Sequence, residues 1–413
     1  MRYAARLLTL TLLAAVGNAA LAAAQTKPAS SSVPLSVRWN RLVPVFSDEA
    51  AANRKSARAA AAGDAAALRR LAQTPAPFPF TIYTLLSTAQ YAAVTSARES
   101  REVSEDAAIA NASAAVLSQI FTDSAVRASI ARELARDVQS IGLRAPDRAL
   151  AAKRLGEDVA GRVIAWAPTL IMVAPWNGTI PKGPGMWYSA PNVPPIGLAM
   201  ATSRTYLLDS SSQFRPAAPP PFGSEEWKSA MEEVRRVARN RTPEQTKSAQ
   251  YWNSGDPWAV WNETAANAIA RSRMSDADAV RVLAILNAAA TDAAIACFDA
   301  KYYYWTIRPS QADTTLELAD DVGLPNFPSF PSKHACSAGA FDAVLGHFFP
   351  KQRAQFTVTA EEQAMSRLYG GIHYRFDNDG GLKLGRVVAR YDIDKERRGG
   401  FNAWRNATVT GKQ

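Results

Sequence analysis

An apolar segment that ends in two cations constrains the fold of this chain more than any other feature. Ser275 and Asp278 form a helix-capping signal, and the residues from Val280 to Phe298 are nearly all apolar, which predicts a buried helix. We expect this helix to continue as far as Arg308. Lys301 and Arg308 are seven residues apart, so they would project from almost the same face, roughly 10 Å apart along the axis.

The few polar residues within this segment predict how the helix is oriented. Arg281, Asp292 and Asp299 fall on one narrow stripe of the helix, and the face that carries Lys301 and Arg308 lies nearly opposite. If the stripe faces water, both cations point inward. Because buried cations need a partner, such a pair predicts a bound anion.

Two of the three histidines occur near residues that could complete an anion site. The first of them lies three residues after a proline. Ser332 is a natural N-cap for a helix that ends before Pro350, and His334 would lie in its first turn. The free backbone N–H groups of a first helical turn, here including that of Lys333, bind anions. His347 falls on another face of the same helix, and we expect it to be structural.

The second histidine lies shortly after a third basic residue that could bind an anion. Thr359 and Glu362 predict the start of a helix that carries Arg367. His373 and Asp377 are four residues apart, which is within reach of a carboxylate–imidazole contact if the segment is helical. A carboxylate on one ring nitrogen fixes the tautomer and leaves the other nitrogen to act as nucleophile or ligand.

In this order, Lys-x6-Arg-Pro, Pro-Ser-x-His and Ser-Arg-x5-His-x3-Asp resemble the signature of the type 2 phosphatidic acid phosphatase (PAP2) and vanadium haloperoxidase superfamily. Upstream, the alanine-rich helices, a Pro/Trp-rich segment and the stretch from Tyr251 to Glu263 are similar to bacterial haloperoxidase-type members. The resemblance implies an all-α fold of helical bundles. It also implies an oxyanion site in the core of the C-terminal bundle.

The resemblance assigns oxyanion binding to five residues. Lys301, Arg308 and Arg367 would bind the oxygens of phosphate or vanadate, and Ser332 and the backbone N–H of Lys333 would add hydrogen bonds. The family's usual glycine is Lys333 in this chain. Its side chain could add a fourth cation, or it could crowd the pocket and lower the pKa of the histidine that follows.

The resemblance also assigns three catalytic residues. His334 would be the acid–base group, and Asp377 would orient His373. His373 would be either the nucleophile that attacks phosphorus or the ligand of vanadium. Phe327 occupies the position at which haloperoxidases carry an aromatic residue near the halide site.

Three functions follow, all with small-molecule substrates. A vanadate-dependent haloperoxidase would oxidise a halide with hydrogen peroxide at a vanadate bound to His373. A phosphomonoesterase without a cofactor would form a phosphohistidine at His373, and His334 would protonate the leaving alcohol. A degenerate phosphate-binding protein, disabled by Lys333, is the third. Chain length, export and the upstream similarity favour the haloperoxidase.

The N-terminus predicts export. Arg2 and Arg6 precede a short apolar run, Leu7 to Val16, and small residues that suit cleavage, so residues 1–24 are expected to be a signal peptide. A membrane anchor is the alternative, but the run is too short to span comfortably. We expect a periplasmic or secreted protein whose mature chain has no transmembrane segment.

The net charge is +10, and +8 without Arg2 and Arg6, since residues 1–24 contain no acid. Basic residues are spread along the chain and mixed with acidic ones, which argues against nucleic-acid binding and suits an anionic substrate. Four segments are expected after the signal peptide: a linker (25–38), an N-terminal helical half (39–166), an irregular Pro/Trp-rich segment that could cover the site (167–222) and a C-terminal helical half (223–400).

The two cysteines lie close in sequence to the anion motifs. Export would allow a disulfide between Cys297 and Cys336. The apolar helical surroundings of both residues suit free buried thiols equally well. The sequence leaves both states open.

Overall fold

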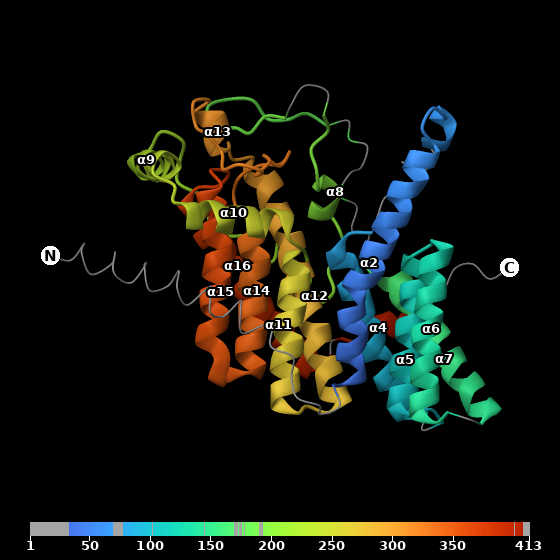
Figure 1. Cartoon of the computed structure of the whole chain (residues 1–413). Helices are drawn as coiled ribbons and strands as arrows, with labels where there is room; N and C mark the ends of the chain where they lie inside the picture. Colours follow the sequence, from blue (N-terminus) through green and yellow to red (C-terminus); the bar gives the residue numbers. More distant parts are fainter. Residues whose placement is uncertain are drawn as a thin grey trace. The chain divides into compact units, whose positions relative to one another are not determined.

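The computed structural model describes residues 33–68, 77–100, 102–143, 145–168, 172, 176, 178–189, 193–399 and 401–407. Within these ranges the protein is helical, and its extended pairing is limited to one isolated antiparallel bridge between Met186 and Thr306. The expected all-α class is therefore confirmed (Figure 1). The expected signal peptide, residues 1–24, lies outside the described residues.

Two compact units interleave along the chain. Counting described residues, the first unit is drawn from 168–260 and 288–399, and the second from 33–167, 261–287 and 401–407. The expected halves correspond to these units only in part, because 261–287 joins the N-terminal helices.

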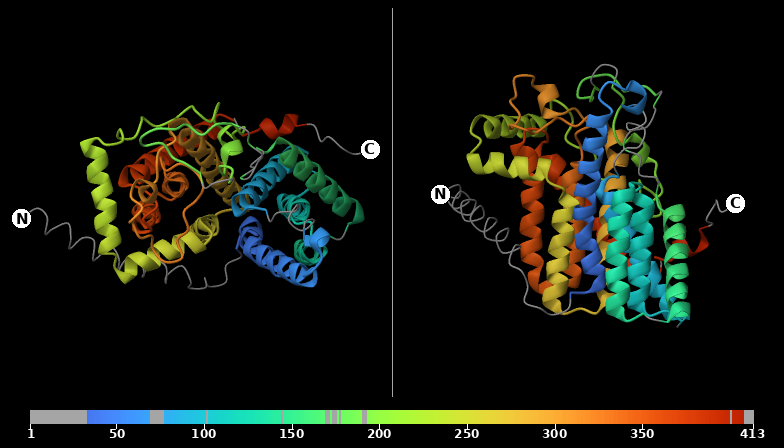
Figure 2. Two further views of the ribbon diagram at one scale, coloured as in Figure 1. Left: turned by 90° about the horizontal axis from the view of Figure 1, so that it is seen from above. Right: turned by 45° about the vertical axis from the view of Figure 1, so that its right-hand side comes forward.

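The second unit is a bundle of long helices (Figure 2). They are α2 (Leu35–Ala60), α4 (Pro79–Ser100), α5 (Glu105–Ile120), α6 (Ser124–Ile141) and α7 (Pro146–Trp166), with the short η2 (Ala403–Asn406) near the C-terminus. Side chains cap two of them, because Ser104 accepts the N–H of Ala107 and Asp123 accepts that of Val126. The expected linker 25–38 ends earlier than predicted, since α2 already begins at Leu35.

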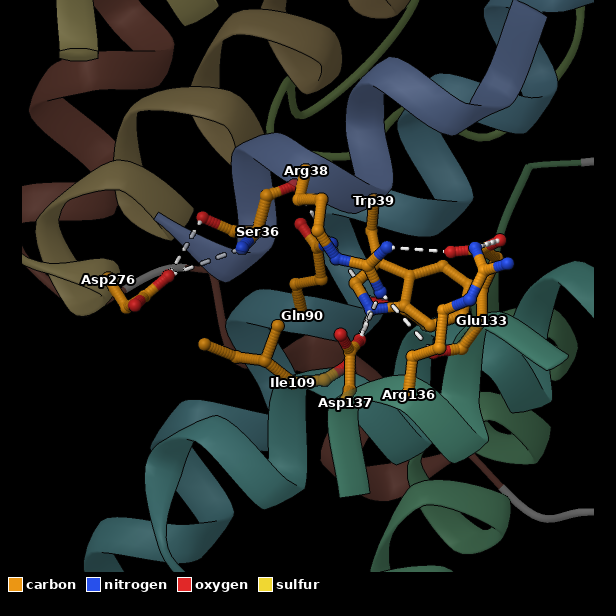
Figure 3. A network of polar contacts seen from close by, with 10 residues as sticks. Ser36, Arg38, Trp39, Gln90, Ile109, Glu133, Arg136, Asp137 and Asp276 are labelled. Atoms are coloured by element: carbon orange, nitrogen blue, oxygen red, sulfur yellow. Dashed lines mark hydrogen bonds and ion pairs between the residues drawn. The ribbon is translucent and has the colours of Figure 1, made fainter. Parts of the chain in front are cut away.

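A partly buried polar network holds α2 within this unit (Figure 3). The indole N–H of Trp39 donates to Asp137 of α6 at 2.7 Å, and Arg38 forms an ion pair with the same carboxylate. At the start of α2, the backbone N–H of Ser36 donates to Asp276 at 3.2 Å. The network thus connects α2 to α6 and to the first turn of α12 (Asp276–Tyr304).

The first unit holds the remaining long helices. They are α9 (Glu225–Arg239), α10 (Pro243–Ser254), α14 (Lys333–Phe348), α15 (Arg353–Tyr369) and α16 (Arg375–Arg397), with the short α8 (Leu198–Ala201), α13 (Pro309–Ala312) and η1 (Pro350–Gln352). Two helices have residues in both units, α12 and α11 (Pro257–Ser272). Helices α14, α15 and α16 run side by side, orange to red in Figure 1, and α14 packs most extensively on α16.

Glycines bring the backbones of α14 and α16 unusually close together. A Cβ atom on Gly385 would stand 2.0 Å from the carbonyl oxygen of Cys336, and one on Gly339 would stand 2.3 Å from that of Leu382. Both distances are far below van der Waals contact, so neither position has room for a side chain. The approach holds the start of α14 against the start of α16, where the N–H of Ser332 donates to the carbonyl of Asp377 at 2.9 Å.

Gly385→Ala is therefore expected to separate α14 from α16 and to lower the free energy of unfolding by about 3 kcal/mol. Gly323→Ala is the matched control, because Gly323 is exposed and a Cβ there meets no atom within 4 Å. Thermal unfolding followed by circular dichroism measures both variants. Equal melting temperatures for Gly385→Ala and the wild type would show that the two backbones can move apart at little cost.

The helix expected from Ser275 to Arg308 is shorter than predicted. Helix α12 ends at Tyr304, where Trp305 takes a left-handed φ of 50°, and Arg308 instead occupies the N-cap of α13. The expectation that Lys301 and Arg308 share one helix face is therefore wrong. Both cations are nevertheless completely buried, as the argument from their surroundings required.

Two residues of the predicted solvent-facing stripe of α12, Asp292 and Asp299, are covered by the irregular segment. Asp292 is fully buried and accepts the backbone N–H groups of Tyr206, Leu207 and Leu208 at 2.7–3.1 Å. Asp299 pairs with Arg215 at 2.8 Å. These two aspartates of the stripe thus face described residues of the segment 167–222 and not water, which sequence periodicity could not distinguish because both environments satisfy polar groups.

The irregular segment also packs on the turn that follows α12. Trp187 is 1% exposed, and its backbone N–H donates to the carbonyl of Trp305 at 2.6 Å. The carbonyl of Gly185 accepts the N–H of Ile307 at 2.9 Å. The described part of this segment therefore supports the turn that carries the chain from Lys301 to Arg308.

Helix α12 is, within the described ranges, long and apolar enough to cross a membrane, a property that the reading of the sequence missed. Of its most apolar window, 94% is buried within the protein. That degree of burial is typical of the central helix of a folded core.

Candidate active site

All eight predicted site residues lie in the first unit. Six of them are almost completely buried: Lys301, Arg308, Ser332, Arg367 and Asp377 are 0% exposed, and His373 is 2% exposed. Three of these are cations and one is an acid, so the group carries excess positive charge where water is excluded. Excess buried charge of this kind requires a negatively charged partner.

His373 is held at both ring nitrogens. Its Nδ1 lies 2.8 Å from Oδ2 of Asp377, and its Nε2 lies 3.0 Å from Nη1 of Arg308. A guanidinium can only donate hydrogen bonds, so Nε2 must be the acceptor and Nδ1 must carry the proton. Burial, and then Arg308 and Lys301, lower the pKa of His373 well below its ordinary value, so the ring is neutral. Nε2 is therefore the ring nitrogen that can bind a ligand or an electrophile, in exchange for the hydrogen bond from Arg308.

Asp377 is the negative centre of this arrangement. Besides His373, its Oδ2 accepts the hydroxyl of Ser329 at 2.6 Å and the backbone N–H of Tyr374 at 3.1 Å. Burial raises the pKa of Asp377 to about 6, against the opposing effects of Ser329, Lys301 and Arg308. The carboxyl group is consequently ionised at neutral pH and can accept all three hydrogen bonds.

Backbone carbonyls hold the two cations in place. Lys301 donates to the carbonyls of Pro328 and Ser329 at 2.8 Å each, which leaves one ammonium proton for a further partner. Nε of Arg308 donates to Phe327 at 3.0 Å, and Nη1 donates to the carbonyl of Ile372 at 2.7 Å. The ring of Phe327 lies 4.9 Å from both cationic groups, so this aromatic residue borders the site.

Ser332 stands at the N-cap of α14, as the sequence predicts, but its side chain makes no capping hydrogen bond. Its Oγ and Nη2 of Arg308 are buried and have no hydrogen-bond partner within the described part of the chain. Two such donors are rarely left unpaired in a folded core. With the first-turn N–H of Lys333, they form the part of the site best suited to the oxygens of an anion.

The guanidinium of Arg367 is held by three hydrogen-bond acceptors. It donates to Oγ of Ser366 at 3.0 Å, to Oδ1 of Asn253 at 3.2 Å and to the carbonyl of Ala249 at 2.6 Å. Burial, and then Arg308, lower its pKa to about 10, so the guanidinium remains charged. Helix α15, which carries Arg367, begins at Arg353.

The predicted start of α15 at Thr359 is therefore wrong. Thr359 lies inside the helix and its hydroxyl donates to the carbonyl of Gln355 at 3.1 Å. A threonine within a helix can make this bond one turn back, so the Thr359–Glu362 spacing imitates a cap. At the other end the helix stops at Tyr369, and Gly371 takes a left-handed φ of 77° that turns the chain toward His373.

His334 and Lys333 lie at the start of α14. Nε2 of His334 lies 3.1 Å from the carbonyl of Trp252, which can only accept, so this nitrogen carries the proton. Burial, then Arg367 and Lys333, lower the pKa of His334 well below its ordinary value. The ammonium of Lys333 lies 4.5 Å from the centre of the Trp258 ring. Lys333 thus acts on the pKa of His334, as one of the two sequence-based alternatives expected.

Cys297 and Cys336 are buried free thiols, one helical turn from Lys301 and Ser332 respectively. The thiol of Cys297 donates to the carbonyl of Pro331 at 3.5 Å, and Cys336 lies close enough to influence the pKa of Cys297. Burial raises the pKa of Cys297, but the neighbouring thiol of Cys336 and the charges of Lys301 and Lys333 outweigh it and lower the pKa. The structure therefore shows the thiol state and not the disulfide.

Several groups of the site were not predicted from the sequence. Ser329 holds Asp377, the side chain of Gln363 donates to the carbonyl of His334 at 2.9 Å, and Asn253 contacts Arg367. Of these, Ser329 had a usable signal, because it precedes Phe330 and Pro331 directly before the Ser332 motif. The others depend on helix pairings that spacing does not encode.

The donor set fits a tetrahedral oxyanion such as phosphate or vanadate. The unpaired donors of Arg308 and Ser332 and the last proton of Lys301 can meet anionic oxygens, while Nε2 of His373 can meet the central atom. The described residues contain no cluster of three or more His, Cys, Asp or Glu side chains that could hold a bare metal cation. Lys301, Arg308, Ser332, Arg367 and His373 are called the oxyanion cage below.

Oxyanion affinity is expected to depend on pH through Lys301. Burial lowers the pKa of Lys301 to about 7, and an anion binds its charged form, so binding must take up a proton above that pKa. Sulfate, whose charge is constant near neutrality, should therefore bind fully below about pH 7 and about tenfold more weakly for each pH unit above it.

Calorimetry in two buffers of different ionisation enthalpy measures this proton uptake. Lys301→Met should weaken sulfate binding at low pH and abolish the pH dependence. A pH dependence that persists in Lys301→Met would assign the titration to another group, with Lys333 the next candidate because burial also lowers its pKa.

The part of the chain that carries this geometry is similar to known proteins. A family model described as PAP2 superfamily matches residues 281–393, which include every residue of the oxyanion cage. Two relatives described as Lipid A 1-phosphatase are 41% identical, that of Rhizobium johnstonii over 70 residues and that of Rhizobium etli over 63. These matches cover 17% and 15% of this chain and 29% and 27% of the relatives, so the chain spans less than a third of their length.

Solved structures match a much larger part of the chain. A bacterial vanadium-dependent iodoperoxidase is similar with a TM-score of 0.62 and 22% identity, over 76% of this chain and 90% of that one. An apo-type bacterial vanadium-dependent chloroperoxidase gives 0.60 and 12%, over 78% and 93%. The chain has the fold of these haloperoxidases, and its residues 281–393 match the PAP2 superfamily model.

Proposed function

We propose that this protein is an exported, vanadate-dependent haloperoxidase-like enzyme that oxidises a halide with hydrogen peroxide. The observation that carries the proposal is the burial of the oxyanion cage, in which no residue is more than 2% exposed. So enclosed a site suits reactants of a few atoms better than a bulky phosphoester. The fold similarity to haloperoxidases over about three quarters of the chain supports the same reaction.

In this function the protein residues bind the cofactor and move protons. Nε2 of His373 would hold the vanadium, and Lys301, Arg308 and Ser332 would bind the oxygens. Bound vanadate would supply a Lewis acid that activates peroxide. Neutral His334 can accept a proton from the incoming peroxide and return it to the departing oxygen.

A second candidate, an exported phosphomonoesterase, is supported by the Lipid A 1-phosphatase relatives. Nε2 of His373 would attack phosphorus as the bond to the leaving oxygen breaks, and His334, after taking up a proton from water, would deliver that proton to the leaving oxygen. Water would then hydrolyse the phosphohistidine. The neutral His373 tautomer is the form that this attack requires, so the two reactions share one ground state.

Parallel assays of the mature protein separate the two reactions. After incubation with orthovanadate, oxidation of iodide and bromide by hydrogen peroxide is measured, and the vanadate-free protein is tested for hydrolysis of p-nitrophenyl phosphate. Vanadate-dependent halide oxidation that is lost in phosphate buffer supports the proposal. Hydrolysis that vanadate inhibits, without halide oxidation, would overturn it in favour of the phosphatase.

A further inference from the structure

A groove between α15 and α16 in the first unit has the features of a second ligand site. Its cavity of about 400 Å³ is lined by residues of these two helices alone, among them Ala364, Met365, Asn378, Leu382, Arg386 and Arg390. None of these residues belongs to the oxyanion cage. The lining residues recur every three or four positions, so each helix presents one face to the groove.

Asn378 is the strongest sign of a ligand. It is 1% exposed and lines the groove, yet neither its amide nitrogen nor its amide oxygen has a hydrogen-bond partner in the described structure. A buried amide without partners costs about 1–3 kcal/mol for each unpaired group. A ligand that both accepts from Nδ2 and donates to Oδ1 would remove that cost.

Arg386 provides a second unpaired donor in the same groove. Its Nε donates to Asp342 at 2.7 Å, but its Nη2 is buried and has no partner within the described chain. Asn378 and Arg386 therefore offer two donors and one acceptor. A protonated phosphate group matches this set, because its charged oxygens accept and its P–OH donates. A carboxylate or sulfate would leave the acceptor unpaired.

The charged side chains around the groove favour a ligand with a single negative charge. Lys383 and Arg390 line it and form no ion pair with another described residue, Glu361 and Asp379 also line it, and Arg375 is held by Glu233 at 2.6 Å. The acidic side chains disfavour a dianion, while the basic ones exclude a cation. On the apolar wall, Ala364, Met365 and Leu382 suit the carbon of an organic phosphate.

We propose that the α15–α16 groove binds a protonated phosphate group, as inorganic phosphate or as a small phosphomonoester, at Asn378 and Arg386. The inference does not rest on the proposed haloperoxidase reaction. Its residues lie outside the cage, so the groove can bind phosphate whichever reaction the cage performs.

Titration calorimetry in a phosphate-free buffer tests the groove. The probe is methylphosphonate, which keeps a protonated tetrahedral group and cannot be hydrolysed; inorganic phosphate and sulfate are compared with it. The groove variant is Arg386→Met/Arg390→Met. Arg397→Met is the matched control, because Arg397 is an exposed arginine of α16 outside the groove.

In the wild type, a methylphosphonate-binding event is expected that sulfate does not displace. It should weaken at least about tenfold in the groove variant and persist in Arg397→Met. Sulfate affinity, which reports on the cage, should be unchanged in both variants. Tighter binding of inorganic phosphate than of methylphosphonate would identify the free ion as the ligand, and the reverse order would identify the monoester.

Asn378→Leu keeps the proposal testable if the arginine variant is unstable. Leucine removes the unpaired amide at similar size, so the ligand-free protein should melt at a higher temperature while the binding event disappears. The proposal is overturned if the wild type shows no sulfate-resistant event. It is also overturned if that event survives both Asn378→Leu and the arginine substitutions.

Discussion

Replacing His373 with alanine is expected to lower turnover at least about a thousandfold, with peroxide and halide or with a phosphomonoester as substrate. In the proposed haloperoxidase this side chain would form the one bond between the protein and vanadium. In the phosphatase it would be the nucleophile. Nε2 is the only unprotonated imidazole nitrogen of the cage, because Nδ1 donates to Asp377 at 2.8 Å, and it can exchange its hydrogen bond from Arg308 for a bond to the reacting atom. No neighbouring group can replace it.

His347→Ala is the matched control for this loss, because His347 is an exposed histidine of the same unit, near the end of α14. It should retain wild-type turnover. His373→Ala should keep its secondary structure by circular dichroism and should still bind sulfate, since Arg308, Ser332 and Lys301 remain. Turnover within tenfold of the wild type would show that the reaction occurs elsewhere.

Much of the oxyanion cage could be predicted because its residue types, in their sequence surroundings, indicate a buried polar site. Cations within an apolar stretch, a serine after a proline and a His–Asp pair four apart are each common, but in one order they limit the chemistry to an oxyanion. The same reasoning failed for α12, where periodicity alone continued the helix through Trp305. The bridge from Met186 and the backbone bonds of Trp187 and Ile307 determine that turn, and they come from residues more than a hundred positions away.

The hydrogen bonds that complete the site could not be predicted for a related reason. Lys301 and Arg308 are oriented by the carbonyls of three consecutive loop residues, 327–329, and His334 by the carbonyl of Trp252. Carbonyl groups are present at every residue, so no sequence pattern marks the ones that are used. Asp292 illustrates the same limit, because its three backbone donors satisfy it as fully as water would.

Asp377→Asn tests whether the charge or the hydrogen bonds of this carboxylate matter more. Three donors converge on Oδ2, from His373, Ser329 and Tyr374, whereas Oδ1 has no partner in the described structure. An asparagine can place its oxygen at the Oδ2 position and its amide nitrogen at the other, so the His373 tautomer would survive. The negative charge that offsets Lys301 and Arg308 would be lost.

We therefore expect Asp377→Asn to fold and to lose activity by about ten- to a hundredfold, the cost typical of a partner that tunes a liganding histidine. Asp377→Ala should lose more and should lower the free energy of unfolding by about 3 kcal/mol, because it leaves three donors and the buried cations without a partner. Asp394→Asn, at an exposed position of α16, is the control. Equal kcat values for Asp377→Asn and Asp377→Ala would mean that the charge alone matters, whereas wild-type kcat in Asp377→Asn would mean that orientation alone does.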